Sequence, residues 1–309
     1  MAEKKYTPMM QHYLKMKEEN PDSILFYRLG DFYEMFFEDA KLVSQELDLV
    51  LTGRSAGVEE KVPMCGIPFH AANSYIQRLV KKGYKVAICE QLEDPSSAKG
   101  LVDRGIIKII TPGTYMDATM DAKSTNYMAS CDVSSFEITV IYCELSTGEL
   151  KYQTLQRSLV ALQKALLEQN VSELVCPMTM DKKWMAALEE MDTMLISKHK
   201  KANIDPEDLP LLNGIESESL KEAFALLMAY LKDTQKQRID HFLPIESMDK
   251  DKVLVMDYET KNHLELVSSQ SSNAKAESLW SFMDKCQSAM GSRMLKPVSY
   301  THLTLPTIR

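Results

Sequence analysis

Residues 24–47 constrain the fold most strongly, because a strand pattern, a turn and a helix pattern follow one another there almost without a gap. The apolar run at 24–27 contains β-branched and aromatic residues, which favour a strand, expected over 24–29. The Gly30-Asp31 pair that follows is typical of a turn. Three apolar residues then recur at helical spacing, which predicts a helix: Ala40, Val43 and Leu47. Strand, turn and helix in this order indicate an α/β fold built in layers.

The same alternation extends across residues 1–115, which we expect to form one α/β domain with a mixed sheet. Thr7-Pro8 combines a hydroxyl N-cap with proline at the first helical position, so a helix is expected from there to just before Asn20. Further strands are predicted at 50–52, 84–91 and 106–110, and a further helix at 71–82. A polar loop is predicted at 53–61, followed by a Pro- and Gly-rich segment that runs to Pro68.

A polar linker at 116–126 precedes a second predicted domain at 127–245. Three strand patterns come first, and helices then alternate with strands. The predicted strands are 128–133, 136–143, 150–154, 174–176 and 193–197, and the predicted helices begin at Leu159, Trp184 and Leu220. Three strands followed by alternating helix and strand form an RNase-H-like arrangement, which is the fold expected for this domain.

A third part is expected at 250–296, with a strand pattern at 253–256 and a helix pattern at 263–267. We expect it to be the start of a helical domain that is cut off near its beginning. Pro297 interrupts the last helix pattern, because proline lacks the amide hydrogen that a helix needs. Residues 297–309 resemble translated sequencing-adaptor read-through, and we expect them to be a non-native tail.

Composition limits the class of protein. With 309 residues, of which 45% are hydrophobic and 26% charged, the chain has the composition of a globular protein of about two domains. No apolar run approaches the ~20 residues that cross a bilayer, and the N-terminus lacks the apolar stretch of a signal peptide. We therefore expect a cytoplasmic protein without a membrane segment.

Cysteine spacing and charge narrow the sites that the chain can hold. The six cysteines lie at least 12 positions apart, whereas paired zinc ligands are separated by about two to four residues, so no metal site is expected. The net charge is −8, and residues 1–115 carry −1 of it, with 15 basic and 16 acidic side chains. This balance argues against a general polyanion binder with a basic stripe, and makes DNA binding depend on where individual basic side chains lie.

Two side chains that follow the Gly-Asp turn, Phe32 and Glu34, are the main candidates for a binding site. Alternation along an extended segment points both to the same face, which sets an apolar wedge beside a hydrogen-bond acceptor. Proteins that sense DNA deformability insert such a wedge between base steps from the minor groove. Phe36 and Phe37, in the same aromatic cluster, are expected in the core. The alternative interpretation places Phe32 in the core as well and makes Glu34 a solvated acid.

Ordered segments across nearly the whole chain resemble signatures of the MutS family of DNA mismatch-repair proteins. The first, Gly-Asp-Phe-Tyr-Glu at 30–34, resembles the mismatch-reading motif of that family. The others are 62–71, 86–91 with Asp94-Pro95, 257–266 and 290–296. The resemblance implies a mismatch-recognition domain at 1–115, a connector domain at 127–245 and the start of a core domain at 250–296.

The resemblance also implies roles for individual residues. Phe32 and Glu34 match the family positions that wedge into a mispaired step and hydrogen-bond a base. Basic residues of the same domain are candidate contacts to DNA phosphates: Arg54, Lys61, Arg78, Lys81 and Lys82. Arg54 is the first choice, because it lies in a glycine-containing loop after a strand. The alternative for each of these side chains is a solvated surface charge.

The resemblance further implies a longer parent protein. The family carries an ATPase site far downstream, whereas these 309 residues contain no Gly-x-x-x-x-Gly-Lys-[Ser/Thr] phosphate loop. We therefore expect no catalytic, cofactor or metal site in this chain, and a clamp with DNA-dependent ATPase activity, using ATP and Mg²⁺, in the parent. The expected partners are mismatched double-stranded DNA, a second copy in a homodimer and a downstream repair protein of the MutL type. The expected location is the bacterial cytoplasm, at the nucleoid when DNA is bound.

Two other interpretations stay open on the residues alone. A metal-dependent nuclease on the RNase-H-like unit needs several carboxylates at strand ends, and Asp132, Glu137 and Glu144 are the candidates. Alternatively, the connector mainly docks other repair proteins, which its acidic balance favours. His70 has no nucleophile or carboxylate partner nearby in sequence, so we expect a structural histidine before a helix.

Overall fold

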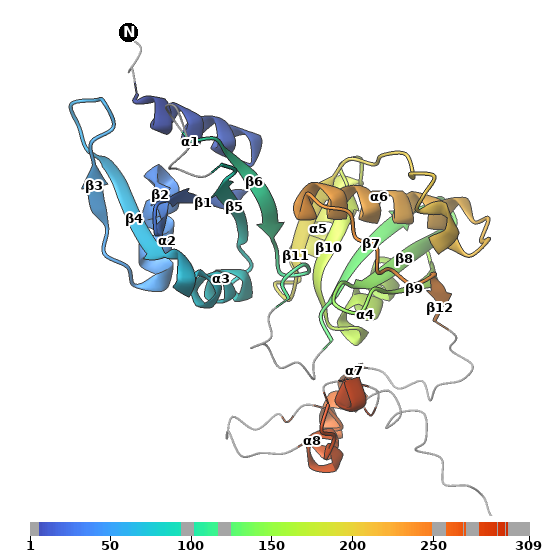
Figure 1. Ribbon diagram of the computed structural model, residues 1–309. Coiled ribbons are helices and arrows are strands. Elements are labelled where there is room, and N and C mark those ends of the chain that lie inside the picture. The colour runs from blue at the N-terminus through green and yellow to red at the C-terminus, as the bar shows by residue number, and fades with distance from the viewer. Residues whose placement is uncertain are drawn as a thin grey trace, which may run out of the picture. The chain divides into compact units, whose positions relative to one another are not determined.

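The computed structural model describes residues 6–93, 102–116, 125–248, 258–267, 269, 278–288, 290–293 and 295. The chain divides into two compact units, the first comprising 1–115 with 228–240 and the second 116–227 with 241–309. Each unit contains a six-stranded sheet with parallel and antiparallel neighbours (Figure 1). The predicted α/β class with mixed sheets is confirmed, whereas the finer assignment of connector and core domains stays a prediction.

The first sheet has the strand order β3-β4-β2-β1-β5-β6, in which β1 and β5 are parallel and the other neighbours antiparallel. Its strands are β1 (Ser23–Leu29), β2 (Phe32–Phe36), β3 (Thr52–Arg54), β4 (Val62–Pro68), β5 (Lys85–Gln91) and β6 (Arg104–Ile110). The helices of this unit are α1 (Pro8–Glu19), α2 (Phe37–Leu47) and α3 (Ala72–Lys81), with a 3₁₀ turn, η1 (Phe69–Ala71), before α3. Helix α1 covers one face of the sheet, and α2 and α3 cover the other (Figure 1).

Strand β4 is the main correction to the sequence prediction, which treated this segment as Pro- and Gly-rich and assigned it no strand. Pro63 and Pro68 lie at the second and last positions of β4, so the missing proline amides leave most of the ladder to β2 intact. The strand predicted at 50–52 is present as β3 but lies two residues later, so Gly53 and Arg54 belong to it and not to the predicted loop. The sheet begins at Thr52, paired with Met64, and the two apolar residues before it stay exposed.

The core between α1 and the first sheet is largely aromatic. Met10 and Tyr13 of α1 pack against Leu25, Tyr27 and Phe36, and all five side chains are buried. The rings of Tyr13 and Phe36 meet edge to face with their centroids 4.9 Å apart. The Tyr13 hydroxyl also donates to the Phe36 carbonyl at 3.3 Å. The expected place of Phe36 in the core is therefore confirmed, and its face of β2 is the one that α1 covers.

The opposite face of the first sheet packs on α2. Cys65, paired in register with Met35, lies 3.5 Å from the Ala40 carbonyl of α2 through its Sγ, which donates to it. Met35 and Cys65 are fully buried, as is Val43 of α2. Alternation along β2 thus sends Met35 to α2 and its neighbours in the strand to the side of α1.

The second sheet has the order β11-β10-β7-β8-β9-β12. Strands β7, β8 and β9 form an antiparallel meander, β10 and β11 continue it with parallel pairing beside β7, and β12 is parallel to β9. The strands are β7 (Tyr127–Val133), β8 (Glu137–Glu144), β9 (Glu149–Gln156), β10 (Val171–Pro177), β11 (Leu195–His199) and β12 (Glu246–Ser247). The helices are α4 (Leu159–Glu168), α5 (Lys182–Glu189) and α6 (Glu218–Gln235), with a 3₁₀ turn, η2 (Leu209–Leu212). The strands and helices predicted for this region are present, with small shifts at their ends.

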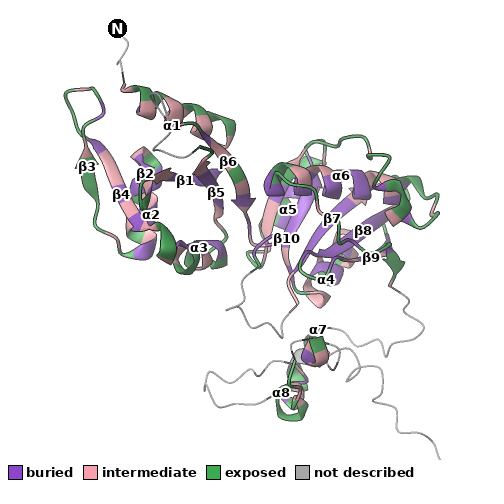
Figure 2. Ribbon diagram, in the orientation of Figure 1, coloured by how far each residue is buried: buried purple, intermediate pink, exposed green. Residues whose placement is uncertain are grey.

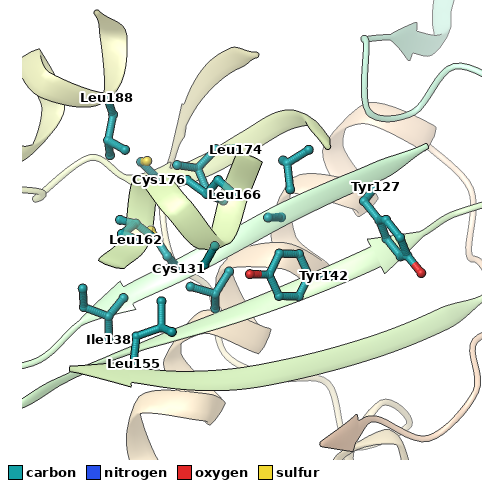
Figure 3. Packing of buried hydrophobic residues seen from close by; sticks show 14 of the residues in the cluster. Tyr127, Cys131, Ile138, Tyr142, Leu155, Leu162, Leu166, Leu174, Cys176 and Leu188 are labelled. Carbon is teal, nitrogen blue, oxygen red and sulfur yellow. The ribbon is translucent and has the colours of Figure 1, made fainter. Parts of the chain in front are cut away.

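The core of the second unit lies between its sheet and helices α4 and α5 (Figure 3). Strands β7 and β8 are buried along most of their length (Figure 2). On the other face, Ser130 Oγ donates to the Ala223 carbonyl of α6 at 2.9 Å. Both faces of this sheet are therefore covered, which explains why its strand patterns read as continuous apolar runs.

The C-terminal part is described only in short pieces, α7 (Tyr258–His263) and α8 (Leu279–Met283). The helix predicted at 263–267 is wrong, because α7 ends at His263 and Glu265 has a left-handed φ of 48°, which a right-handed helix does not accept. The predicted strand at 253–256 and the tail at 297–309 lie outside the described residues. In the part of the chain that is described, no helix is long and apolar enough to span a membrane.

Candidate nucleic-acid interface

The Gly30-Asp31 turn joins β1 and β2 into an antiparallel hairpin, in which Leu29 pairs with Phe32 and Tyr27 with Glu34. Gly30 has φ 59°, a left-handed conformation that suits glycine because it has no Cβ. The motif that follows the turn is itself a strand, so its side chains alternate between the two faces of the sheet.

Phe32 and Glu34 lie side by side on one face of the hairpin, over Gly66 of β4. A methyl group built on Gly66 would lie 3.6 Å from Glu34 Cγ and 3.8 Å from Phe32 Cδ1. Phe32 is 47% exposed, whereas Tyr33, which points to the other face, is 7% exposed. The interpretation of Phe32 as a core residue is therefore wrong. An exposed aromatic ring beside a carboxylate is the arrangement that the alternation predicts.

Arg54, the last residue of β3, forms an ion pair with Glu34. Its Nη1 donates to Glu34 Oε2, and its guanidinium carbon lies 5.9 Å from the centroid of the Phe36 ring. The sequence singled out Arg54 as a phosphate contact and did not predict this pair. The contact depends on β4, which lies between the two residues and brings them together.

Arg28 and Phe69 hold the end of the hairpin, and the sequence analysis singled out neither. The Arg28 guanidinium carbon stacks 3.8 Å from the Phe69 ring centroid, its Nε donates to the Gly30 carbonyl, and its Nη1 lies 3.4 Å from Glu90 Oε1. The Phe69 amide donates to the Asp31 carbonyl at 2.9 Å. Arg28 lies directly before the Gly-Asp turn and Phe69 lies inside the recognisable segment 62–71, and those positions are the signal that points to them.

A second set of contacts lies around Tyr27 of β1, the residue paired with Glu34. The Tyr27 hydroxyl and His12 Nδ1 are 2.9 Å apart, and the Arg104 guanidinium carbon lies 5.4 Å from the Tyr27 ring centroid. Burial raises the pKa of Tyr27 to about 12. Burial and the nearby Arg104 cation lower the pKa of His12. Both rings are therefore uncharged near neutral pH, and the positive charge of this set lies on Arg104.

Comparison with known proteins places the sequence that forms this site in a family. Residues 7–119 match the family model of MutS domain I. Over 296 residues the chain is 43% identical to the DNA mismatch repair protein MutS of Bacillus licheniformis, which covers 94% of this chain and 33% of that protein. The chain belongs to the MutS family. The MutS proteins of Clostridium tetani and Bacillus subtilis are each 41% identical to it, over 94% of this chain and 34% of theirs. The chain thus spans about a third of the length of the curated relatives it matches.

In this MutS-family chain the other candidate phosphate contacts lie apart from Phe32. Lys61 is exposed in the loop before β4. Arg78 of α3 lies 3.9 Å from Asp48 Oδ2 through its Nη2 and donates to the Leu47 carbonyl at 3.5 Å, at the end of α2. Helix α2 is on the face opposite Phe32, so the structure does not bring Arg78 to the site. Its role as a phosphate contact stays a prediction.

The remaining candidates of α3 and η1 are surface side chains. Lys82 pairs with Glu46 at 2.6 Å, and Lys81 is exposed. His70 is exposed in η1, directly before α3, with its ring edge-on to Phe69 at 5.9 Å. The expected position of His70 before a helix is confirmed.

The carboxylates of the nuclease hypothesis do not converge. Asp132, near the end of β7, accepts from Lys201 Nζ and from Ser219 Oγ, each at 3.0 Å. Glu144 lies at the far end of the β7–β8 pair, and Glu137 at the near end. Among the described residues, no group of three or more His, Cys, Asp and Glu side chains is placed to hold a metal ion. The nuclease hypothesis therefore has no support in this MutS-family chain.

Proposed function

We propose that this chain recognises mismatched double-stranded DNA in mismatch repair. Phe32 inserts as a wedge into a mispaired step, and Glu34 hydrogen-bonds a base beside it. The observation that carries the proposal is the 47% exposure of Phe32 on the strand face that it shares with Glu34. A buried aromatic side chain has no access to a base step, whereas this one is held at the end of a hairpin by its backbone and by its neighbours.

The energetics of stacking explain how a wedge selects mispaired steps. Opening a base step costs a few kcal/mol, and the cost is smallest where pairing is already faulty. An inserted aromatic ring recovers roughly 1–3 kcal/mol by stacking on a base. Insertion is therefore favourable at weak steps and unfavourable at sound ones. Because this selection depends on deformability, one wedge serves many different mispairs.

Glu34 adds a second test of the step. DNA phosphates repel a nearby carboxylate. A hydrogen-bond donor that faces the carboxylate offsets this repulsion. A base displaced from its pair offers such a donor, whereas a fully stacked base pair does not. The charge of Glu34 thus penalises paired DNA, and its hydrogen bond offsets that penalty at a mismatch.

Fixing the hairpin end is the contribution of Arg28 and Phe69. A side chain that pushes bases apart transmits the resisting force to its own backbone, so the turn has to be rigid. The stack of Arg28 on Phe69 and the two bonds to the carbonyls of Gly30 and Asp31 provide that support. These contacts favour insertion over displacement of the turn.

We further propose that the first unit is the mismatch-recognition domain and the second the connector domain of a longer protein. The order of the second sheet, a three-strand meander extended by two parallel strands, supports an RNase-H-like connector. Residues 250–296 are assigned to the start of the core domain. The longer parent protein is then an ATP- and Mg²⁺-dependent clamp that acts as a homodimer. It works in the bacterial cytoplasm, at the nucleoid when bound to DNA, and interacts with a downstream repair protein of the MutL type.

The test is the change Phe32→Ala, with Phe136→Ala as a matched control. Phe136 is 90% exposed and belongs to the second unit, so its removal deletes an exposed aromatic ring that is not part of the candidate site. Affinities for a G·T-mismatched duplex and its fully paired counterpart are measured by fluorescence anisotropy. The protein is the full chain, and in parallel a Bacillus licheniformis MutS in which residues 6–248 of this chain replace the matching residues.

We expect Phe32→Ala to lower the ratio of mismatched to paired affinity by about tenfold or more, the equivalent of losing one stacked base. The thermal midpoint should stay unchanged, and Phe136→Ala should retain the full ratio. Equal ratios of mismatched to paired affinity for the unsubstituted protein and Phe32→Ala would contradict the proposal.

A further inference from the structure

We propose that Arg54 is a positioning residue for Glu34, and that the pair of side chains, rather than Glu34 alone, sets the preference for a mismatched step. This inference rests on the function proposed above and extends it. A contact restricted to the DNA backbone would strengthen binding to every duplex alike. A contact that fixes the base-reading carboxylate changes how well one duplex is told from another.

The path of the Arg54 side chain is the first argument. Arg54 pairs in register with Val62 of β4, and Glu34 pairs with Gly66 of the same strand from the other side. The guanidinium therefore crosses β4 to reach the carboxylate, passing the ring of Phe36 on the way. The register of β4 with both neighbouring strands therefore sets the direction of this contact.

Gly66 leaves the surface beside Glu34 without a side chain. It lies on β4 directly opposite Glu34, and any side chain there would touch both Glu34 and Phe32. Without one, the carboxylate lies against the sheet beside the wedge. The Glu34 side chain is 16% exposed, well below the 36% of Arg54, so the carboxylate is the more enclosed partner of the pair.

A fixed carboxylate reads a base better than a free one. A glutamate side chain has three rotatable bonds, and holding it in one position before DNA arrives removes an entropy cost from binding. This effect acts only if Glu34 is present.

The same guanidinium retains donors for DNA. Among the described residues, Glu34 is the carboxylate that pairs with Arg54, and the bond uses one guanidinium nitrogen, Nη1. Arginine carries further N–H groups in a planar fork, which suits it to hold a carboxylate and a phosphate together. Arg54 thus links the residue that reads the base to the backbone of the same duplex.

The decisive experiment is a double-mutant cycle with Arg54→Ala, Glu34→Gln and the combination of both. Glu34→Gln keeps the size of the side chain and removes its charge. Arg54→Lys keeps a cation without the planar fork, and Arg78→Ala removes a candidate phosphate contact that pairs with Asp48 instead of Glu34. All variants are measured on mismatched and paired duplexes, at several salt concentrations, in the full chain and in the MutS carrying residues 6–248.

We expect Arg54→Ala to lower the ratio of mismatched to paired affinity by roughly tenfold when Glu34 is present, and to leave the ratio unchanged in the Glu34→Gln background. Arg54→Lys should restore part of the ratio. Arg78→Ala should leave it unaltered. Circular dichroism of each variant checks that the sheet is intact, and Arg54→Lys carries the test if Arg54→Ala unfolds.

An equal loss of affinity for both duplexes, the same in either background, would overturn the inference. The salt dependence would then fall by the release of about one counterion, the mark of a phosphate contact alone. That result leaves the function proposed for Phe32 in place. If the protein without substitutions shows no preference for the mismatched duplex, the proposed function itself is overturned, and this inference with it.

Discussion

Two ion pairs of similar exposure lie on the two sheets of this molecule and have different surroundings. In the first unit, Glu34 and Arg54 are 16% and 36% exposed; in the second, Asp132 and Lys201 are 15% and 31% exposed. Each pair joins a strand carboxylate to a cation from another segment. By partial burial and charge alone, the two would be equally good candidates for a site.

The neighbours of the two pairs make the difference. Lys201 also binds Glu222 at 2.7 Å, and Ser219 donates to Asp132 at 3.0 Å, so the second pair is enclosed by polar partners of its own unit. Beside the first pair stands Phe32, an exposed aromatic ring. The second pair is thus surrounded by polar groups, whereas the first has an exposed apolar neighbour. This difference in environment is what favours the first pair as the candidate site.

The largest effect that sharpens this comparison is expected from Phe36→Ala. The ring of Phe36 is 1% exposed and lies beneath Arg54, whereas Phe32, on the same face of the strand, is 47% exposed. Removing a buried phenylalanine leaves a cavity and costs about 3–5 kcal/mol of unfolding free energy. Phe32→Ala should cost less than about 1 kcal/mol. Urea unfolding followed by circular dichroism measures both.

Similar losses from the two changes would show that Phe32 is a packing residue, and the contrast between the two ion pairs would lose its basis. An intermediate control is available in Phe37→Ala, since Phe37 is partly buried against the same core. Its loss of unfolding free energy should fall between the other two.

The second effect separates the two carboxylates. Glu34→Ala should lower the ratio of mismatched to paired affinity by about tenfold, mainly because paired DNA is no longer repelled. Asp132→Ala should leave that ratio unchanged. It should instead cost about 1–3 kcal/mol of unfolding free energy, because Lys201 and Ser219 lose a charged hydrogen-bond partner.

Fluorescence anisotropy with the two duplexes and urea unfolding of the two variants give the four values needed. A change in mismatch preference on Asp132→Ala would place the second pair in the site. Mg²⁺-dependent cleavage of DNA that disappears in the same variant would restore a nuclease role for the second unit.

Local pattern was enough to predict much of the fold. The apolar runs of β1, β5 and β10 and the amphipathic spacing of α3 gave their elements correct types, because each signal is contained in a few consecutive residues. Strand β4 escaped, because Pro63, Gly66 and Pro68 are residues of turns when read without a neighbour. Their effect on a ladder depends on which amide faces which strand, and that information lies in the pairing.

The same limit applies to the site. Phe32 and Glu34 are two positions apart, so alternation alone predicts that they share a face. Arg54 and Glu34 are 20 positions apart, and their contact depends on the register of β4 with both neighbours. The stack of Arg28 on Phe69 likewise joins two segments through the sheet. The shared face of Phe32 and Glu34 was predictable here, and their contacts with other segments were not.

The smallest effect is expected from pH, through His12 in the first unit. Burial and Arg104 lower the pKa of His12 below its ordinary value of 6.5, and its Nδ1 lies 2.9 Å from the Tyr27 hydroxyl. The unfolded chain takes up the proton on His12 at higher pH than the folded one. The contribution of neutral His12 to the stability of the folded state is therefore complete above about pH 6.5. It is lost progressively as the pH falls toward the folded-state pKa. Glutamine cannot titrate, so His12→Gln should remove this part of the pH dependence.

Hydrogen exchange of peptides from residues 6–93, compared between pH 7.5 and 5.5 after correction for the intrinsic rate, reports on the first unit by itself. We expect protection of β1 and β5 to fall more in the parent chain than in His12→Gln. Since Tyr27 pairs with Glu34 in the ladder, loosening β1 also loosens the strand that carries the carboxylate. Mismatch preference should therefore weaken together with protection in the parent chain, and stay level in His12→Gln. Identical pH profiles in the two proteins would exclude His12 as the source.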